Sequence, residues 1–181
     1  MMIETERLLL RPFCPDDLEL IERLYCDGAI LKYTPFDAMT RAEAAAHLDR
    51  IIREFGQPPA NDFELAVLLK ETGERLGRTH IEICRETDTG MIGWFLLPEH
   101  WNRGYATELT AALIGHCFDV LRLHRVNAVC NPANEASRRV LERCGMRLEA
   151  HFRRKCRYVK RGVVSWEDEL EYALLASERQ D

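Results

Sequence analysis

A glycine-bearing loop near the middle of the chain has the residue types that a phosphate-binding site needs. Gly104 lacks the Cβ that would hold a ligand away from the backbone, Ala106 keeps the next turn small, and Arg103 adds a cation. The first backbone N–H groups of a helix lack intrahelical partners and lie at the positive end of its dipole, so an anion can bind there. An ordinary strand-to-helix turn, with glycine chosen for its tolerance of positive φ, explains the same residues equally well.

The elements on either side must position this loop. The run from Met91 to Leu97 is apolar throughout, which is typical of a strand buried on both faces. Beyond Gly104 an amphipathic helix is predicted, because apolar or small residues recur at helical spacing at Ala106, Leu109, Leu113, Cys117, Val120 and Leu121. The glycine spacing of a dinucleotide-binding fold and the Gly-Lys-Ser/Thr ending of a Walker loop are both absent. Neither of those nucleotide-binding folds is therefore expected.

Periodicity and capping residues predict the remaining elements, and together they predict one α/β domain over residues 1–181. Helices are predicted from Asp16, from the capping box of Thr40 and Glu43 to Gly56, and from the cap Asn134 to Gly145. Strands are predicted over residues 6–13, 63–69, 76–84 and 125–130, and over 148–154 and 166–174, which close as a hairpin. The strand at 125–130 must run parallel to the one at 91–97, because a helical crossover joins them. The sheet is therefore mixed.

Length and composition describe an ordinary globular protein. The chain has 181 residues, 46% of them hydrophobic, and a formal net charge of −5, which argues against a nucleic-acid partner. It has no apolar run of about 18 residues and does not open with a signal peptide, so we expect a cytoplasmic protein without a membrane-spanning segment. The seven cysteines and six histidines show no metal-ligand spacing, so we expect no metal site.

A strongly basic segment near the C-terminus is followed by an acidic one. Arg153, Arg154, Lys155, Arg157, Lys160 and Arg161 precede Gly162, whereas Glu167, Asp168, Glu169 and Glu171 follow it. Opposed charges on either side of a glycine are typical of cross-strand partners in a hairpin. A surface for an acidic substrate or partner is the alternative interpretation, and an RNA surface is a third.

Two longer motifs, in this order along the chain, resemble the GNAT N-acetyltransferases. The first is Gly-Trp-Phe-Leu-Leu-Pro-Glu-His-Trp-Asn-Arg-Gly-Tyr-Ala-Thr-Glu at 93–108, and the second is Asn-Pro-Ala-Asn-Glu-Ala-Ser-Arg-Arg-Val-Leu-Glu-Arg-Cys-Gly-Met at 131–146. The chain is most similar to the Rim-type branch, which acetylates protein N-terminal amines, and the similarity spans nearly its whole length. The resemblance implies a mixed, mostly antiparallel sheet of about seven strands with about four helices, in which the central parallel strands splay apart.

The resemblance also implies acetyl-CoA as the acetyl-donor cosubstrate. In the family the pyrophosphate lies on backbone N–H groups of the glycine loop, and the pantetheine arm runs between the splayed strands. The corresponding cofactor-binding residues are Phe95, Leu96, Leu97, Asn102, Arg103, Gly104, Tyr105, Ala106, Thr107, Asn134 and Ser137. This chain departs from the family at three positions. Trp101 stands where the family usually has Gln or Arg, and Asn102 stands where it often has Gly. Leu141 or Val140 occupies the position of the Tyr that acts as general acid in many members.

Acetyl transfer from a thioester to an amine needs a place for the oxyanion and a proton for the leaving thiolate. Backbone N–H groups near Leu96 and Leu97 are expected to bind the oxyanion. Ser137 matches the Asn-x-x-Ser placement of the family and is the candidate proton donor or thiolate ligand. Alternatively, Ser137 is only a first-turn residue of the helix that Asn134 caps.

The reaction also needs the amine in its neutral form, which raises the question of a base. The period of two along a strand places Arg78, His80 and Glu82 on one face, so His80 and Glu82 are the candidate bases. The alternative is that this face is simply solvated. An α-amino group, with a reference pKa of about 7.7 to 8.0 against about 10.4 for Lys, needs little help from a base.

Three functions follow from these observations. The first is acetyl-CoA-dependent N-acetyl transfer, by direct attack within a ternary complex, to a primary amine such as a protein or peptide N-terminus. The second is acetylation of a small amine such as a polyamine or an aminoglycoside. The third is a non-catalytic acetyl-CoA-binding module. The sequence leaves open whether the chain forms a homodimer.

Overall fold

The structure, a computed structural model, describes residues 1–26, 28–58 and 60–179. In this part of the chain there are eight strands and four α-helices. Their bounds are β1 Ile3–Glu4, β2 Leu8–Pro12, α1 Leu18–Tyr25, α2 Arg41–Glu54, β3 Asp62–Leu69, β4 Arg75–Cys84, β5 Thr89–Leu96, α3 Tyr105–Asp119, β6 Arg125–Cys130, α4 Glu135–Arg143, β7 Arg147–Lys160 and β8 Val163–Leu175. Residues 180 and 181 of the predicted domain lie outside the described residues.

All eight strands belong to one mixed sheet with the order β1-β2-β3-β4-β5-β6-β8-β7. Every neighbouring pair is antiparallel except β5 and β6, which α3 joins as a parallel crossover. This arrangement confirms the α/β, mostly antiparallel fold class. The strand beyond the expected seven is the two-residue β1, which is too short to leave a periodic signal.

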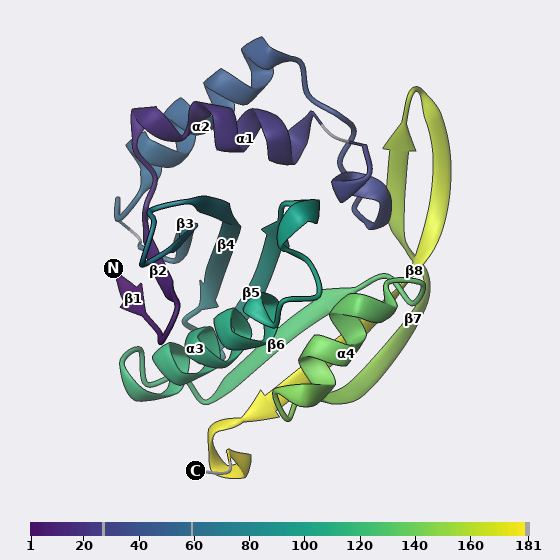
Figure 1. The fold of residues 1–181 in the computed structure, drawn as a ribbon. Coiled ribbons are helices and arrows are strands. Elements are labelled where there is room, and N and C mark those ends of the chain that lie inside the picture. The colour runs from purple at the N-terminus through teal and green to yellow at the C-terminus, as the bar shows by residue number, and fades with distance from the viewer. Residues whose placement is uncertain (27, 59, 180–181) are drawn as a thin grey trace.

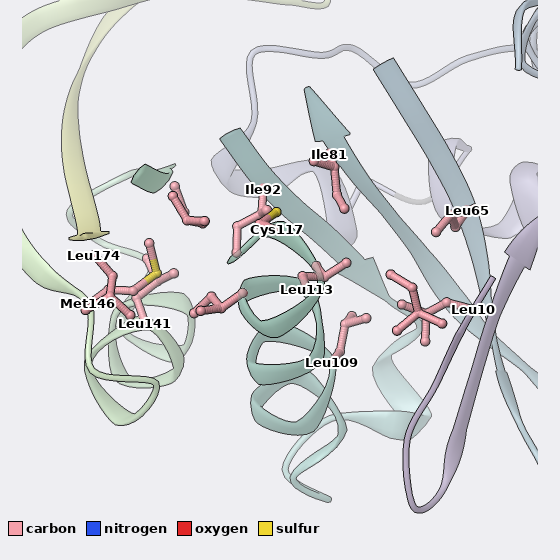
Figure 2. Packing of buried hydrophobic residues seen from close by; sticks show 14 of the residues in the cluster. Leu10, Leu65, Ile81, Ile92, Leu109, Leu113, Cys117, Leu141, Met146 and Leu174 are labelled. Atoms are coloured by element: carbon pink, nitrogen blue, oxygen red, sulfur yellow. The ribbon is translucent and has the colours of Figure 1, made fainter. Parts of the chain in front are cut away.

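Two hydrophobic clusters hold the helices on opposite faces of the sheet (Figure 1). α3 contributes Leu109, Leu113 and Cys117 to one face, where Figure 2 shows them pointing towards Leu10 of β2, Leu65 of β3, Ile81 of β4 and Ile92 of β5. α1 and α2 cover the other face with Leu24, Tyr25, Leu48 and Ile51, which pack against Ala66, Leu68 and Leu97. The predicted apolar stripe of α3 is thus confirmed up to Cys117.

One detail of the predicted elements is wrong. α3 ends at Asp119, and Val120 is 62% exposed instead of joining the apolar stripe, because the helix has already ended there. The strand predicted at 91–97 is covered on both faces, with Ile92 and Leu96 in one cluster and Leu97 in the other, although Trp94 and Phe95 are only half-buried. An apolar run alone does not distinguish full from partial cover of a strand.

The predicted C-terminal hairpin is present and is longer than expected. β7 and β8 extend to a two-residue turn, where Arg161 has φ 51° and Gly162 has φ 77°. Consecutive positive φ values match the right-handed twist of a hairpin, and glycine adopts them at no steric cost. The register shifts between Phe152 and Cys156, where Arg154 also has a positive φ of 49°. The hairpin projects past the edge of the helical layer (Figure 1).

One buried carboxylate joins the start of the helical layer to the sheet. Asp17 is completely buried, and its carboxylate accepts hydrogen bonds from Arg11 at 2.7 and 2.9 Å, from Arg75 at 2.7 Å and from the Cys14 backbone at 2.9 Å. Burial alone would raise the pKa of Asp17, but the two guanidinium groups hold it well below its ordinary value. The ionised form is therefore the one that the fold stabilises.

Replacing Asp17 with Asn should lower the free energy of unfolding at pH 7 by about 2 to 4 kcal/mol, because two arginines lose their charged partner. A depressed carboxyl pKa contributes stability above the unfolded value of about 3.9 and loses it as the pH falls below that value. The difference between wild type and Asp17→Asn should therefore shrink on going from pH 7 to pH 3, measured by urea denaturation. Asp16→Asn, at an exposed neighbour, is the control. An unchanged midpoint for Asp17→Asn at pH 7 contradicts this prediction.

Candidate functional site

The parallel strands β5 and β6 separate soon after they begin. They pair only at Thr89 with Arg125, Gly90 with Val126 and Met91 with Asn127. Beyond these pairs β5 continues to Leu96 along β4, while β6 continues to Cys130 along β8. The expected splay of the central strands is therefore present, and one edge of β5 is left without a neighbouring strand from residue 92 to 96.

The direction of the backbone decides which groups of β5 face this gap. The Leu97 N–H donates to the Leu76 carbonyl at 2.8 Å, so the Leu97 N–H and the main-chain groups of Phe95 face β4. Successive residues of a strand face opposite neighbours, so those of Leu96 and Trp94 face the gap. The Leu96 carbonyl accepts a hydrogen bond from the Trp101 indole at 2.7 Å. Of residues 95–97, which were predicted to contact the pantetheine arm, only Leu96 directs its main-chain groups into the gap. Those of Trp94, which was not predicted, also face the gap.

The glycine loop has the conformation that exposes a helix start. Gly104 is the N-cap of α3 with φ 81°, and no side chain caps the helix there. The first intrahelical hydrogen bond runs from Glu108 N–H to the Gly104 carbonyl at 3.1 Å. Within the described residues, the N–H groups of Tyr105, Ala106 and Thr107 have no recorded acceptor. These N–H groups are available to an anion.

Asn102 stands where the resembling family often has glycine, and its backbone is left-handed. Its φ is 58°, in the left-handed region, which asparagine tolerates better than most residues. Asn102 and Arg103 are both exposed, so neither side chain closes the approach to the helix start. The departure from glycine at this position is therefore compatible with the backbone path.

α4 carries Ser137 in its first turn and contacts the start of α3 at its other end. The Asn134 side chain caps α4 by accepting from the Ser137 N–H at 3.2 Å, as its sequence position predicts. The Cys144 thiol at the other end of α4 lies 3.5 Å from the Thr107 carbonyl in the first turn of α3. Ser137 is half-buried, and its hydroxyl has no hydrogen-bond partner among the described residues. Its backbone is therefore used by the cap, whereas its hydroxyl is available.

His80 and Glu82 share a face of β4 with Arg78, but they differ in environment. Glu82 is exposed, whereas His80 is half-buried and its Nδ1 lies 3.1 Å from Arg78 Nη2. A guanidinium only donates, so this contact assigns Nδ1 as acceptor and the ring proton to Nε2. Burial and then the charge of Arg78 lower the pKa of His80 to about 3. His80 is therefore a neutral imidazole at pH 7 and a weak base.

Arg78 organises a buried polar contact that the sequence does not indicate. It is 7% exposed, bonds to the Tyr25 hydroxyl of α1 and lies 3.1 Å from the Glu64 carboxylate of β3. Its guanidinium also lies 5.5 Å from the centre of the Phe95 ring. The sequence pattern around Arg78, a strand of alternating polar and apolar residues, does not predict the partners of its guanidinium, because these partners belong to separate elements. The contact ties α1 to the sheet beside the splay.

The basic segment is only partly neutralised by its hairpin partners. Lys155 pairs with Glu169 at 2.6 Å and His151 lies 2.7 Å from Asp168, which confirms cross-strand contacts between the two charged runs. Arg153 and Arg154 are exposed and form no side-chain ion pair within the described residues. The bulge removes this part of β7 from regular register with β8, and here the Arg154 backbone N–H, instead of its guanidinium, bonds to Asp168 of β8 at 2.8 Å.

The tip of the hairpin is fixed to the connection between α1 and α2. The Tyr158 hydroxyl donates to the Tyr33 carbonyl at 2.8 Å, and Lys160 Nζ donates to the Leu31 carbonyl at 2.5 Å. The Arg161 N–H donates to the Asp37 carboxylate at 2.7 Å. The hairpin and the α1–α2 connection, far apart in sequence, thus lie side by side (Figure 1).

Over residues 1–26, 28–58 and 60–179, no group of three or more His, Cys, Asp or Glu side chains is placed to hold a metal ion. None of the helices in these ranges is long and apolar enough to cross a membrane. The seven cysteines are all free thiols.

Comparisons with known proteins identify the family. Residues 7–147 match the sequence model described as acetyltransferase (GNAT) domain. The N-acetyltransferase YnaD of Bacillus subtilis is 32% identical over 178 residues, which cover 98% of this chain and 99% of YnaD. A GNAT-family acetyltransferase structure from Bacillus anthracis is 30% identical with a TM-score of 0.84, covering 98% of this chain and 100% of that one. The chain therefore belongs to the GNAT acetyltransferases and is an acetyl-CoA-dependent acyltransferase.

A more distant solved structure shares the fold. RimL, described as a ribosomal L7/L12 alpha-N-protein acetyltransferase in complex with coenzyme A, has a TM-score of 0.80 at 18% identity. The match covers 97% of this chain and 98% of RimL. The overall fold is thus shared at low sequence identity.

Replacing Gly104 with Val should abolish most of the rise in melting temperature that CoA causes, because a branched side chain disfavours φ 81° and blocks the helix start. At about 100 times its Kd, CoA should stabilise the wild type by about 2.7 kcal/mol. Gly73→Val is the matched control, since Gly73 has φ 71° but lies in the β3–β4 turn. A full CoA shift in Gly104→Val would show that this loop is only a turn.

Proposed function

We propose that this protein transfers an acetyl group from acetyl-CoA to the N-terminal α-amino group of a protein or peptide, by direct attack within a ternary complex. The observation that carries the proposal is the splay of β5 and β6 beside an uncapped helix start. An extended thioester can lie along the open edge of β5 with its phosphates on the loop before α3. We propose that residues 1–181 act together as one catalytic domain.

The donor would be held mainly by backbone groups. The pyrophosphate would contact N–H groups from Arg103 to Thr107, with Asn102 shaping the loop and Asn134 fixing the start of α4. The gap-facing backbone groups of Trp94 and Leu96 would bind the pantetheine arm, and one of their N–H groups would stabilise the oxyanion. Such donors cost no reorganisation during the reaction, because β4 holds the strand along its whole length.

Proton transfer would place few demands on the side chains. A CoA thiolate is a good leaving group, so the free hydroxyl of Ser137 would suffice as proton donor or thiolate ligand. An α-amino group is partly neutral near pH 7.5, because its reference pKa is about 7.7 to 8.0. Glu82, acting through water, is the better placed base, since His80 is a weak base with Nδ1 already bonded to Arg78. His80 would then orient the acceptor through its Nε2 proton.

Two observations support an acidic peptide over a cationic small molecule as acceptor. The exposed Arg153 and Arg154 lack ion-pair partners in the described part of the chain and so present positive charge beside the hairpin. Cationic polyamines and aminoglycosides would be repelled by this charge, whereas acidic residues after the acetylated terminus would be attracted. The description of RimL as an alpha-N-protein acetyltransferase adds support by analogy of fold.

Ser137→Ala should lower kcat by roughly 10- to 1000-fold with little change in CoA affinity, if the hydroxyl assists departure of the thiolate. Asn134→Ala is the structural control, because it removes the cap from the same helix turn and should cost about 1 kcal/mol of stability. Thiol release at saturating substrates and thermal unfolding would be measured for both variants. Turnover of Ser137→Ala equal to that of wild type rules out the catalytic role.

The acceptor class is tested by the salt dependence of kcat/KM. For a peptide with acidic residues after its N-terminus, kcat/KM should fall as salt rises from about 0.01 to 0.15 M, where the Debye length shrinks from about 30 to 8 Å. Arg153→Ser with Arg154→Ser should flatten this dependence and leave CoA binding intact. Arg85→Ser with Arg122→Ser is the matched control, since both arginines are exposed and Arg122, like Arg154, has a positive φ. Faster turnover of spermidine or an aminoglycoside than of every peptide would refute the proposed acceptor and leave the donor site standing.

A further inference from the structure

The turn between β1 and β2 reaches across the sheet to the first turn of α3. Arg7 Nε lies 2.6 Å from Glu108 Oε2, and the Arg7 N–H donates to Glu108 Oε1 at 2.8 Å. The hydroxyl of Thr5 donates to the same carboxylate at 2.5 Å. Three donors from a turn 101 residues away in sequence thus converge on one side chain at the start of α3.

The same guanidinium also contacts the glycine loop directly. Arg7 Nη1 donates to the Arg103 carbonyl at 3.2 Å, and the guanidinium carbon lies 4.6 Å from the centre of the Tyr105 ring. A Cβ on Gly104 would lie 3.4 Å from Arg7 Nη2. The peptide unit is planar and trans, so a carbonyl of Arg103 that faces Arg7 directs the Gly104 N–H to the opposite side.

Glu108 has a charge that would otherwise work against a phosphate ligand. Its carboxylate lies in the first turn of the helix whose N–H groups are to receive the pyrophosphate, and like charges repel. Burial alone would raise the pKa of Glu108, but the hydrogen bonds from Thr5 and Arg7 lower it, so the group is ionised at pH 7. Arg7 therefore both neutralises Glu108 and holds the loop.

We propose that Arg7 is a positioning residue for the acetyl donor, which fixes the peptide between Arg103 and Gly104 and cancels the charge of Glu108 beside the pyrophosphate. This role rests on the proposed phosphate-binding function of the loop. The proposal gives the β1–β2 turn a role in the affinity for the acetyl donor, although this turn is far from the glycine loop in sequence. Arg7 acts through the loop and needs no contact with the reacting atoms.

The first test separates donor binding from chemistry. Arg7→Ala should raise the Kd of CoA about 10- to 100-fold in calorimetry, as expected for lost charge-assisted hydrogen bonds, and kcat at saturating acetyl-CoA should stay within about twofold. S-acetylpantetheine, which lacks the pyrophosphate, should be turned over equally well by wild type and variant. Lys70→Ala is the control: Lys70 bonds to Glu4 and to the Thr5 carbonyl of the same turn, at 3.1 Å each, without contacting the loop.

The second test uses the charge of Glu108. Arg7→Ala combined with Glu108→Gln should recover part of the lost CoA affinity, because the double variant no longer leaves an uncompensated carboxylate beside the phosphates. Arg7→Lys should recover less than wild-type affinity, since an ammonium cannot replace the planar fork of donors.

Three outcomes would overturn the proposal. The first is a wild-type affinity for CoA in Arg7→Ala. The second is a loss of CoA affinity in Lys70→Ala as large as that in Arg7→Ala. The third is a loss of S-acetylpantetheine turnover in Arg7→Ala as large as its loss with acetyl-CoA. Each is distinct from a failure of the loop itself, which would appear as an undiminished CoA shift in Gly104→Val. Normal CoA binding in Arg7→Ala together with weakened CoA binding in Gly104→Val would support the donor site and contradict only the role of Arg7.

Discussion

β5 and β6 are each held along their length by an antiparallel neighbour, and the gap between them depends on this constraint. β4 pairs with β5 from Thr89 to Leu96, and β8 pairs with β6 from Arg125 to Cys130. The two strands can therefore part after three paired residues without loss of order on either side. A strand edge in a protein interior would normally be a liability, because unpaired backbone groups cost free energy. Here the open edge has the polarity and direction that an extended amide-containing ligand requires.

The helix start next to this gap, which we propose as an anion site, has an acidic residue in its first turn. Acidic residues near a helix N-terminus stabilise the helix, yet they compete with an anionic ligand for the same dipole. Glu108 is instead bonded to Arg7 and Thr5, which lie between β1 and β2 at one edge of the sheet. The N–H groups of the loop are thereby left to the ligand, and the carboxylate serves to anchor the β1–β2 turn.

The proposed acceptor side depends on two contacts between separate layers. Arg78 joins α1 to β3 and β4, and the tip of the β7–β8 hairpin is bonded to the connection between α1 and α2. Neither contact supplies a reacting group. Together they fix the position of the helical layer relative to the hairpin, on which the shape and charge of the acceptor approach depend. At the bulge near Arg154, the side chains of Arg153 and Arg154 are exposed and form no ion pair within the described residues.

The sequence by itself determined the elements and the glycine loop proposed to bind the donor, because these follow from local patterns. Apolar periodicity located the strand, loop and helix around Gly104, the Asn134 cap fixed the start of α4, and Gly162 marked the hairpin. The two motifs indicated the family for the same reason, since each is a continuous stretch of chain.

Only the tertiary structure decided the contacts that these elements make with one another. Strand register sets which residues of β5 face the gap, so Trp94 joins Leu96, whereas Phe95 and Leu97 turn to β4. The pairing of Arg7 with Glu108, and the burial of His80 beside Arg78 that lowers the pKa of His80, depend on how separate parts of the backbone meet. Side chains brought together by folding leave no periodic trace in the sequence, because periodicity records only which face of its own element a residue occupies.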